Sequence, residues 1–209
     1  MKNYYSKNLS AERLHLCYKI SSDRIKQYQE EEIRTVLDRT NPNDFVLDLG
    51  CGYGRVFKHL LKKTQNVYGV DISFDNLYYA RNEYLESASH NLIQMNAVKL
   101  GFLSDTFDLV FCIQNGISAF KEEPKALITE SIRVTKPGGR VLFSSYSSKI
   151  WAARLEWFQA QAEYGLLGEI DYNLTGNGVI ICKDGFKATT FNASDFEQLT
   201  QIFDKEVKI

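Results

Sequence analysis

The chain has 209 residues, which fits one domain, and its 44% apolar and 13% aromatic residues are enough to bury a hydrophobic core, which excludes a disordered chain. The formal net charge is −1 and no long block of like charges occurs, which argues against nucleic acid or an anionic membrane surface as a partner. The four cysteines lie far apart, the N-terminus lacks the apolar run of a signal peptide and no stretch approaches a membrane span, which predicts a reduced, soluble, cytoplasmic protein without a metal site.

Short β-branched runs alternate with longer helical patterns, which is typical of βαβ units and a parallel sheet. The expected strands share a short apolar run followed by a turn signal, and they cover 45–49, 67–70, 92–95, 107–113 and 140–145. Before the first strand, helical patterns predict one or two helices within 10–40. Between the strands they predict a helix over 54–63, a helix capped by Ser73 and a helix that begins near Pro124. The turn at 136–139 is expected to lead into the fifth strand.

The pattern changes after the fifth strand. Apolar residues at helical spacing predict an amphipathic helix over 151–162, and Asp184-Gly185 predicts a hairpin over 179–191. Ser194 to Glu197 has the form of a capping box that opens a last helix, and 207–209 reads as a strand.

A glycine-rich turn, Gly50-Cys51-Gly52-Tyr53-Gly54, directly follows the first strand and precedes a helix. Glycines allow a sharp turn and let a ligand approach the backbone without meeting a Cβ atom. Doubly wound folds bind their cofactors in the crevice at the carboxyl ends of the strands, so this turn is a candidate cofactor site. The alternative is an ordinary tight turn with only a structural role.

Asp71 ends the second strand, where a carboxylate can accept both hydroxyl groups of a ribose. The charged residues nearby bear on the cofactor class. The dinucleotide fingerprint requires a small residue at the position of Arg55, and Asp48 would repel a pyrophosphate. S-adenosylmethionine carries an ammonium and a sulfonium group, so Asp48 favours it over NAD.

From Phe45 to Tyr146 the sequence resembles the class I S-adenosylmethionine-dependent methyltransferases. Asp48 to Gly54 resembles the first motif of that family, Met95-Asn96-Ala97 its adenine-binding stretch, and Arg133 to Gly139 the turn before its fifth strand. Asn96 departs from the family pattern, because a carboxylate is more usual there. The resemblance implies a doubly wound, mostly parallel α/β sheet of the Rossmann-like methyltransferase type, with N-terminal helices and a C-terminal hairpin.

The resemblance and the residue chemistry together give a set of candidate cofactor-binding residues, which lie at the carboxyl ends of the first four strands. They are Asp48, Gly50, Cys51, Gly52, Tyr53, Gly54, Arg55, Asp71, Ile72, Asn76, Asn96, Ala97, Val98, Gln114 and Asn115. No catalytic base is assigned, because methyl transfer requires one only if the acceptor arrives protonated.

The expected organisation is a single domain over 1–209, with a helical cap over 1–40, a cofactor-binding core over 45–146 and a substrate-side, sheet-closing segment over 147–209. The family sheet normally ends with an antiparallel strand. Either the hairpin supplies that strand, or the polypeptide is a shortened form whose exposed sheet edge favours a homodimer.

The predicted function is transfer of a methyl group from S-adenosylmethionine to a small-molecule acceptor of unknown identity, at N, O or C. Trp151, Trp157, Tyr164 and Tyr172 could line the acceptor pocket, although their spacing favours core packing. Tyr4, Tyr5 and Tyr18 could form a lid over the site by analogy with the family. Two alternatives remain: a non-catalytic binding module with the same fold, and an NAD-dependent oxidoreductase.

Overall fold

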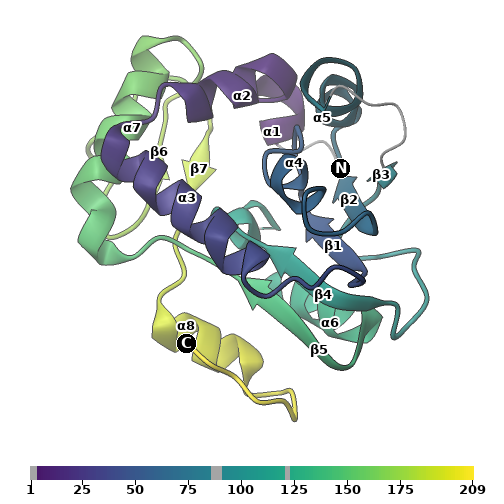
Figure 1. Cartoon of the computed structure of the whole chain (residues 1–209). Coiled ribbons are helices and arrows are strands. Elements are labelled where there is room, and N and C mark those ends of the chain that lie inside the picture. Colours follow the sequence, from purple (N-terminus) through teal and green to yellow (C-terminus); the bar gives the residue numbers. More distant parts are fainter. Residues whose placement is uncertain (1–3, 86–90, 121–122) are drawn as a thin grey trace.

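The computed structural model describes residues 4–85, 91–120 and 123–209 (Figure 1). Its main sheet has five parallel strands in the order β3-β2-β1-β4-β5. These strands are β1 Val46–Leu49, β2 Val67–Asp71, β3 Asn91–Gln94, β4 Phe107–Cys112 and β5 Thr135–Phe143. The strand order reverses between β1 and β4, which leaves a crevice at their carboxyl ends.

Helices cover both faces of this sheet, as the predicted doubly wound fold requires. The helices are α1 Tyr4–Asn8, α2 Ala11–Lys19, α3 Asp23–Leu37, α4 Phe57–Leu60, α5 Phe74–Tyr79, α6 Pro124–Val134, α7 Trp151–Glu163 and α8 Ala193–Thr200. A π-helix, Ala80–Tyr84, continues α5, and 3₁₀ turns occupy Gly116–Phe120 and Ser148–Ile150. None of the helices in the described ranges is both long and apolar enough to cross a membrane.

Alternate residues of β1 explain why helices pack on both faces. Val46 belongs to a buried cluster with α3, α4 and α5, whereas its neighbour Leu47 belongs to a second cluster with α6. Successive strand residues point to opposite faces, so a strand that is buried at every position requires cover on both sides.

A third buried cluster lies beyond the carboxyl end of the sheet. It joins α1, α2, α3 and α7 to a small antiparallel hairpin, β6 Ile180–Ile181 and β7 Lys187–Ala188. Figure 1 shows α7 and the hairpin beside α2 and α3, on the opposite side of the molecule from α5. This cluster positions the N-terminal helices over the crevice, although residues 1–3 of the predicted cap lie outside the described residues.

Several predicted elements differ from the structure. The N-terminal region contains α1 in addition to the two helices within 10–40, and the helix expected from position 54 begins only at Phe57, because the glycine turn extends further than predicted. Position 135 already begins β5, so the turn expected at 136–139 lies inside an irregular strand whose Gly138 has a φ of 79°.

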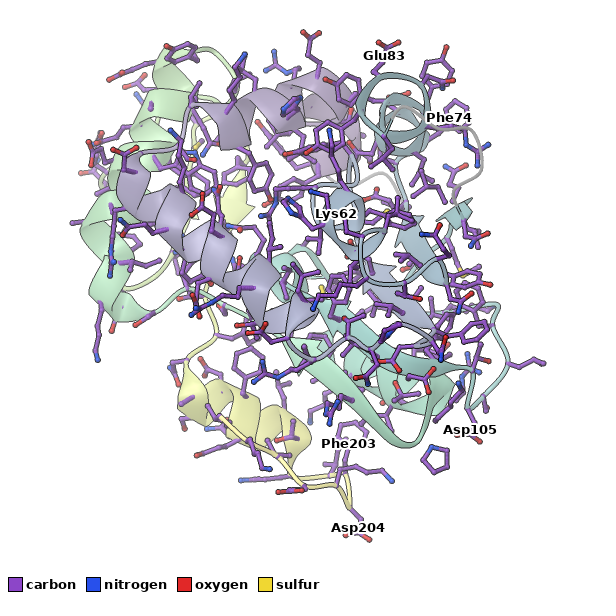
Figure 2. All side chains as sticks on the ribbon, viewed as in Figure 1. Lys62, Phe74, Glu83, Asp105, Phe203 and Asp204 are labelled. Atoms are coloured by element: carbon purple, nitrogen blue, oxygen red, sulfur yellow. The ribbon has the colours of Figure 1, made fainter. Side chains whose placement is uncertain are left out.

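The C-terminal predictions require three corrections. The capping box of α8 is formed by Asn192 and Asp195, not by Ser194 and Glu197, because the helix starts two residues earlier than predicted. The hairpin forms a separate two-stranded sheet and adds no strand to the main sheet, so it does not close it. Residues 207–209 form no strand, and Phe203 and Asp204 lie nearby at the periphery (Figure 2).

Candidate cofactor and acceptor site

A cavity of about 560 Å³ opens at the carboxyl ends of β1 and β4. The turns after β1, β2, β3 and β4 line one end of it, and α1, α2, α7 and the hairpin line the other. A volume of this size lies within the range of known small-molecule sites. The two ends are named the cofactor end and the acceptor end below.

The glycine turn after β1 forms the floor of the cofactor end. Gly50, Gly52 and Gly54 have φ values of 73°, 54° and 85°, a region that other residues rarely adopt. The backbone N–H of Gly50 and that of Cys51 donate to the Val70 carbonyl oxygen at 2.8 and 3.0 Å, which fixes the turn against β2. A Cβ at Gly52 would lie 3.2 Å from a methyl group of Leu14 on α2, so the N-terminal helices approach this turn closely.

The carboxylate of Asp71 braces the same turn. It accepts hydrogen bonds from the backbone N–H of Gly52 at 2.9 Å, from that of Ser73 at 2.8 Å and from the side-chain amide of Asn76 at 3.4 Å. Burial raises the pKa of Asp71, and these three donors oppose the rise. A carboxylate has about four acceptor positions, so Asp71 can still accept from a ribose while it holds the turn.

Asp48 lies beneath the glycine turn and is only 4% exposed. Its Oδ2 atom has no hydrogen-bond partner within the described residues. Burial is the largest influence on the pKa of Asp48 and raises it to about 8, although the Arg55 guanidinium acts in the opposite direction. A cationic ligand above the turn would compensate this buried carboxyl group.

Arg55 extends from the glycine turn toward the acceptor end. Its guanidinium carbon lies 4.8 Å from the centre of the Tyr18 ring, and its Nη2 donates to the side-chain oxygen of Gln114 at 3.3 Å. Arg55 therefore links the turn after β1 to α2 and to the end of β4, and it lines the cavity together with these partners.

The loop after β4 is held in an unusual conformation. Gln114 and Asn115 have φ values of 57° and 56°, which is costly for two consecutive residues that are not glycine. The backbone N–H of Gln114 donates to Oε1 of Glu32 at 3.0 Å, and the same oxygen accepts from the hydroxyl groups of Tyr28 and Ser144. Burial raises the pKa of Glu32 and these donors oppose the rise, so α3 holds the loop through one buried carboxyl group.

The loop is fixed on its second side by Asn115. The side-chain amide of Asn115 donates to the carbonyl oxygen of Thr189 at 2.7 Å and to the hydroxyl of Ser118 at 3.0 Å, and its oxygen accepts from Ser145 at 2.7 Å. The end of β4, the end of β5 and the segment after β7 therefore meet at one buried amide.

The turns after β2 and β3 complete the cofactor end. Gln94 donates from its side chain to the carbonyl oxygen of Ile72 at 3.0 Å, which ties the two turns together. Asn96 lines the cavity, and its amide oxygen accepts from the backbone N–H of Val98 at 3.2 Å. Ala97 is buried beside it, so this wall presents one small apolar and one polar surface.

Aromatic rings dominate the acceptor end. Trp157 of α7 is 5% exposed, and its indole N–H donates to the Cys17 carbonyl oxygen at 2.7 Å, which joins α7 to α2. Tyr18 packs against Trp157 with ring centres 6.0 Å apart, and Phe158 packs against Phe186 of the hairpin at 5.6 Å. Chain segments that are far apart in sequence thus form one wall.

Most of the predicted site residues line this cavity. Thirteen of them do so, namely Asp48, Gly50, Cys51, Gly52, Tyr53, Arg55, Asp71, Ile72, Asn76, Asn96, Ala97, Gln114 and Asn115. Gly54 and Val98 are not among the lining residues. Gly54 instead approaches Leu85, to which an added Cβ would come within 3.0 Å.

The predicted aromatic site residues also divide into some that line the cavity and others that do not. Tyr5, Tyr18 and Trp157 line the cavity, whereas Tyr164 and Tyr172 are exposed on the outer surface. The sequence analysis did not assign a further group of cavity residues to the site, among them Leu9, Cys17, Tyr146, Phe158, Gln161, Phe186 and Ala188. Helical spacing had placed Phe158 on an apolar stripe, but no local signal connects the others to the glycine turn.

Comparison with known proteins shows which family profile and which solved structures the chain resembles. Residues 46–139 match the sequence profile of the family described as Methyltransferase domain. A structure from Pyrococcus horikoshii OT3 superimposes with a TM-score of 0.64 at 23% identity, over 100% of this chain and 94% of that one. A methyltransferase structure from Methanosarcina mazei gives a TM-score of 0.59 at 20% identity, over 80% of this chain and 82% of that one. These likenesses show the fold.

Curated relatives include a ubiquinone biosynthesis O-methyltransferase of Idiomarina loihiensis, 30% identical over 50% of this chain and 43% of that protein. Another, from Hydrogenovibrio crunogenus, is 27% identical over 74% of this chain and 60% of its own length. The chain spans about half the length of the curated relatives it matches. The matched residues, 46–139, make up a little under half of the chain and support a methyltransferase domain in that part of it. The Oδ2 atom of Asp48, beneath the glycine turn, has no hydrogen-bond partner among the described residues, and it would fit the cationic methionine end of S-adenosylmethionine.

Proposed function

We propose that this protein transfers a methyl group from S-adenosylmethionine to a small-molecule acceptor. The observation that carries the proposal is the buried Asp48 carboxyl group beneath a glycine turn, whose Oδ2 atom has no hydrogen-bond partner among the described residues. A ligand with an ammonium and a sulfonium group would favour the ionised form of this carboxyl group and be attracted by it, whereas a pyrophosphate would disfavour that form. The NAD alternative is therefore disfavoured, and the match to the methyltransferase profile also supports the first reading.

The cofactor end supplies a partner for each part of the cofactor. Asp71 would accept the ribose hydroxyl groups, and Ile72, Asn96 and Ala97 would contact the adenine. The glycine turn from Gly50 to Gly54, with Asp48 and Arg55, would hold the methionine part. Asn76 would support Asp71 through its hydrogen bond to the carboxylate, and Val98 would support the lining residues Asn96 and Ala97 from behind. Gln114 and Asn115 would close the site from the β4 side.

The bound cofactor supplies an electrophilic methyl group, to which an acceptor lone pair bonds as the carbon–sulfur bond breaks and its electron pair remains on sulfur. The chain's own contribution is to hold the acceptor in line and to exclude water. Positioning of this kind accounts for a large part of the rate enhancement when the reaction is a direct displacement. The rings of Tyr18, Trp157 and Phe186 surround the place where the acceptor would lie.

The organisation of the chain enters the proposal as well. We regard residues 1–209 as one domain, in which the segment 1–40 and the segment after 147 together form the acceptor end. The names of the curated relatives support a small organic acceptor. A cytoplasmic location and a homodimer formed along the β5 edge are further hypotheses that solution measurements of the full chain would test.

Titration of S-adenosylmethionine into the purified protein by calorimetry tests the proposal, with Asp71→Ala, Asp71→Asn and NAD as comparisons. We expect micromolar binding, about −8 kcal/mol, and a loss of about 1.5–3 kcal/mol for Asp71→Ala, because hydrogen bonds to a charged group disappear. Asp71→Asn keeps the shape and part of the hydrogen bonding, so it should lose less. A folded protein that does not bind S-adenosylmethionine, or that binds NAD more tightly, would disprove the proposal.

Turnover separates an enzyme from a binding module. Incubation of the protein with labelled S-adenosylmethionine and a panel of small acceptors should release S-adenosylhomocysteine only when an acceptor is present. Tight binding without turnover for any acceptor would favour the non-catalytic alternative.

A further inference from the structure

A buried positive charge lies behind the aromatic wall of the acceptor end. Arg154 of α7 is only 1% exposed. Its Nη1 donates to the Gly178 carbonyl oxygen at 2.9 Å, but its Nε and Nη2 are buried without a partner within the described residues. None of the salt bridges found in the described part of the chain involves Arg154. A buried guanidinium without a carboxylate partner is unusual and unfavourable.

Aromatic rings separate this charge from the cavity. The guanidinium carbon of Arg154 lies 4.5 Å from the centre of the Tyr146 ring and 5.5 Å from that of Phe158, and both rings line the cavity. Burial lowers the pKa of Arg154, and the phenols of Tyr146, Tyr5 and Tyr28 oppose the shift. The compensation that the described residues provide is therefore the weak attraction of ring faces and phenol oxygens.

The same arrangement weakens the binding of a cation next to Arg154. Cationic amines bind to the faces of aromatic rings, but arginines already occupy ring faces in this wall: Arg55 at Tyr18, and Arg154 at Tyr146 and Phe158. An ammonium group placed beside Tyr146 or Phe158 would meet rings polarised by Arg154 and would be repelled by its guanidinium group.

None of the described residues that line the acceptor end carries a carboxylate. The cavity-lining residues that come from α1, α2, α7 and the hairpin carry no charge, and examples are Leu9, Trp157, Gln161 and Phe186. The carboxyl groups of the described cavity wall lie elsewhere: Asp48 beneath the glycine turn, Asp71 at the end of β2 and Glu123 just before α6. The lining of the acceptor end is thus apolar. The Arg55 guanidinium is balanced by the nearby Glu32 and Asp48 carboxyl groups, whereas the Arg154 guanidinium behind Tyr146 has no carboxylate beside it among the described residues.

We propose that the acceptor is an organic acid with a planar, apolar body, whose carboxylate lies near Tyr146 and is attracted by Arg154 from behind that ring. This inference rests on the proposed methyltransferase function and names the substrate class of the same site. The rings supply contact area for the body, and the guanidinium supplies the discrimination between an acid and an amine, because charges interact strongly across a wall from which water is excluded.

Three small molecules that share a phenol body test the charge preference: 4-hydroxyphenylacetate, its neutral amide 4-hydroxyphenylacetamide, and tyramine. Each is titrated into the protein saturated with S-adenosylhomocysteine. We expect the acid to bind more tightly than the amide, and the amide more tightly than the amine, with a preference for acid over amine on the order of tenfold or more. Equal or tighter binding of tyramine would overturn the proposal, and so would failure of all three to bind while S-adenosylhomocysteine is bound.

Variants of Arg154 test the source of the preference. Arg154→Met keeps the length of the side chain but removes its charge, so acid and amine should bind within about threefold of each other. Arg154→Lys retains a charge and should keep most of the preference. Arg34→Met, at an exposed arginine on α3 that pairs with Glu31, is the matched control and should leave it unchanged. An undiminished preference in Arg154→Met would show that Arg154 is not the source.

Failure of the inference is distinguishable from failure of the proposed function. If S-adenosylhomocysteine does not bind to folded wild-type protein, the methyltransferase proposal fails before any acceptor is added. If S-adenosylhomocysteine binds and the acid has no advantage, only the inferred acceptor class fails. Because the preference is measured in the wild-type protein, it remains informative even if an Arg154 variant does not fold.

Discussion

The two ends of the cavity are built in different ways. The cofactor end comes mainly from one short segment, Asp48 to Arg55, and from residues that directly follow neighbouring strands. The acceptor end brings together Tyr5, Trp157 and Phe186, which belong to three distant segments. The cofactor end therefore depends on local backbone conformation, whereas the acceptor end depends on tertiary packing between α1, α2, α7 and the hairpin.

The largest effect on stability is expected from a substitution that affects only the acceptor end. Trp157→Ala removes a buried indole and its hydrogen bond to the Cys17 carbonyl oxygen. We expect the free energy of unfolding to fall by about 3–5 kcal/mol, the usual cost of deleting a buried aromatic side chain. Denaturant titration measures this as a lower midpoint at an unchanged slope.

Two comparisons make the Trp157 result decisive. Tyr164→Ala, at an exposed aromatic residue just after α7, should change the free energy of unfolding by no more than about 0.5 kcal/mol. The affinity of folded Trp157→Ala for S-adenosylhomocysteine should remain within a few-fold of wild type. A loss of affinity as large as the loss of stability would show that the two ends are not independent.

The buried Asp48 of the cofactor end should make the stability of the protein depend on pH. Its pKa in the folded protein is about 8, which lies above its value in an unfolded chain, so the folded state holds a proton that the unfolded state has released. Stability is therefore fully present below about pH 4 and is lost as the pH rises toward 8. At a limiting slope of about 1.4 kcal/mol per pH unit, Asp48 should cost about 2 kcal/mol between pH 6 and pH 8.

Asp48→Asn should remove that part of the pH dependence, and chemical denaturation at several pH values would measure it. Asp105→Asn is the control, because Asp105 is exposed in a loop far from the turn (Figure 2). It should keep the wild-type slope. If Asp48→Asn also kept that slope, the pKa of Asp48 would not be raised in the folded protein and another group would be the source of the pH dependence.

The same local-versus-distant distinction explains what could be predicted from sequence. Strand positions and the glycine turn follow from short apolar runs and from residues such as Gly50 and Gly52, whose positive φ values only glycine adopts readily. Asp71 was predicted to bind ribose, but its bond to the Gly52 N–H was not, because hydrogen bonds between two turns depend on how neighbouring strands are paired.

The acceptor end was harder to predict for a physical reason. Nothing near Arg154 in the sequence indicates that it lies against Tyr146, because α7 returns over the end of β5 only when the hairpin and the N-terminal helices pack together. Even a local pattern can be displaced. Asn192 and Ser194 are both good N-cap residues, and the structure uses the earlier of the two.

The smallest change in stability is expected from the loss of a predicted helix cap in the cofactor end. Ser73 was predicted to cap the helix after β2, and its hydroxyl accepts from the Asn76 backbone N–H at 3.3 Å. Ser73→Ala should lower the free energy of unfolding by about 1 kcal/mol.

Ser22 is the matched control: it precedes α3 in the same way, but its hydroxyl makes no capping bond. Ser22→Ala should therefore be nearly neutral. Because the Asp71 carboxylate is held by the backbone N–H of Ser73 rather than by its side chain, affinity for S-adenosylhomocysteine should survive Ser73→Ala, and a large loss would show that the cap, not Asp71, fixes the turn.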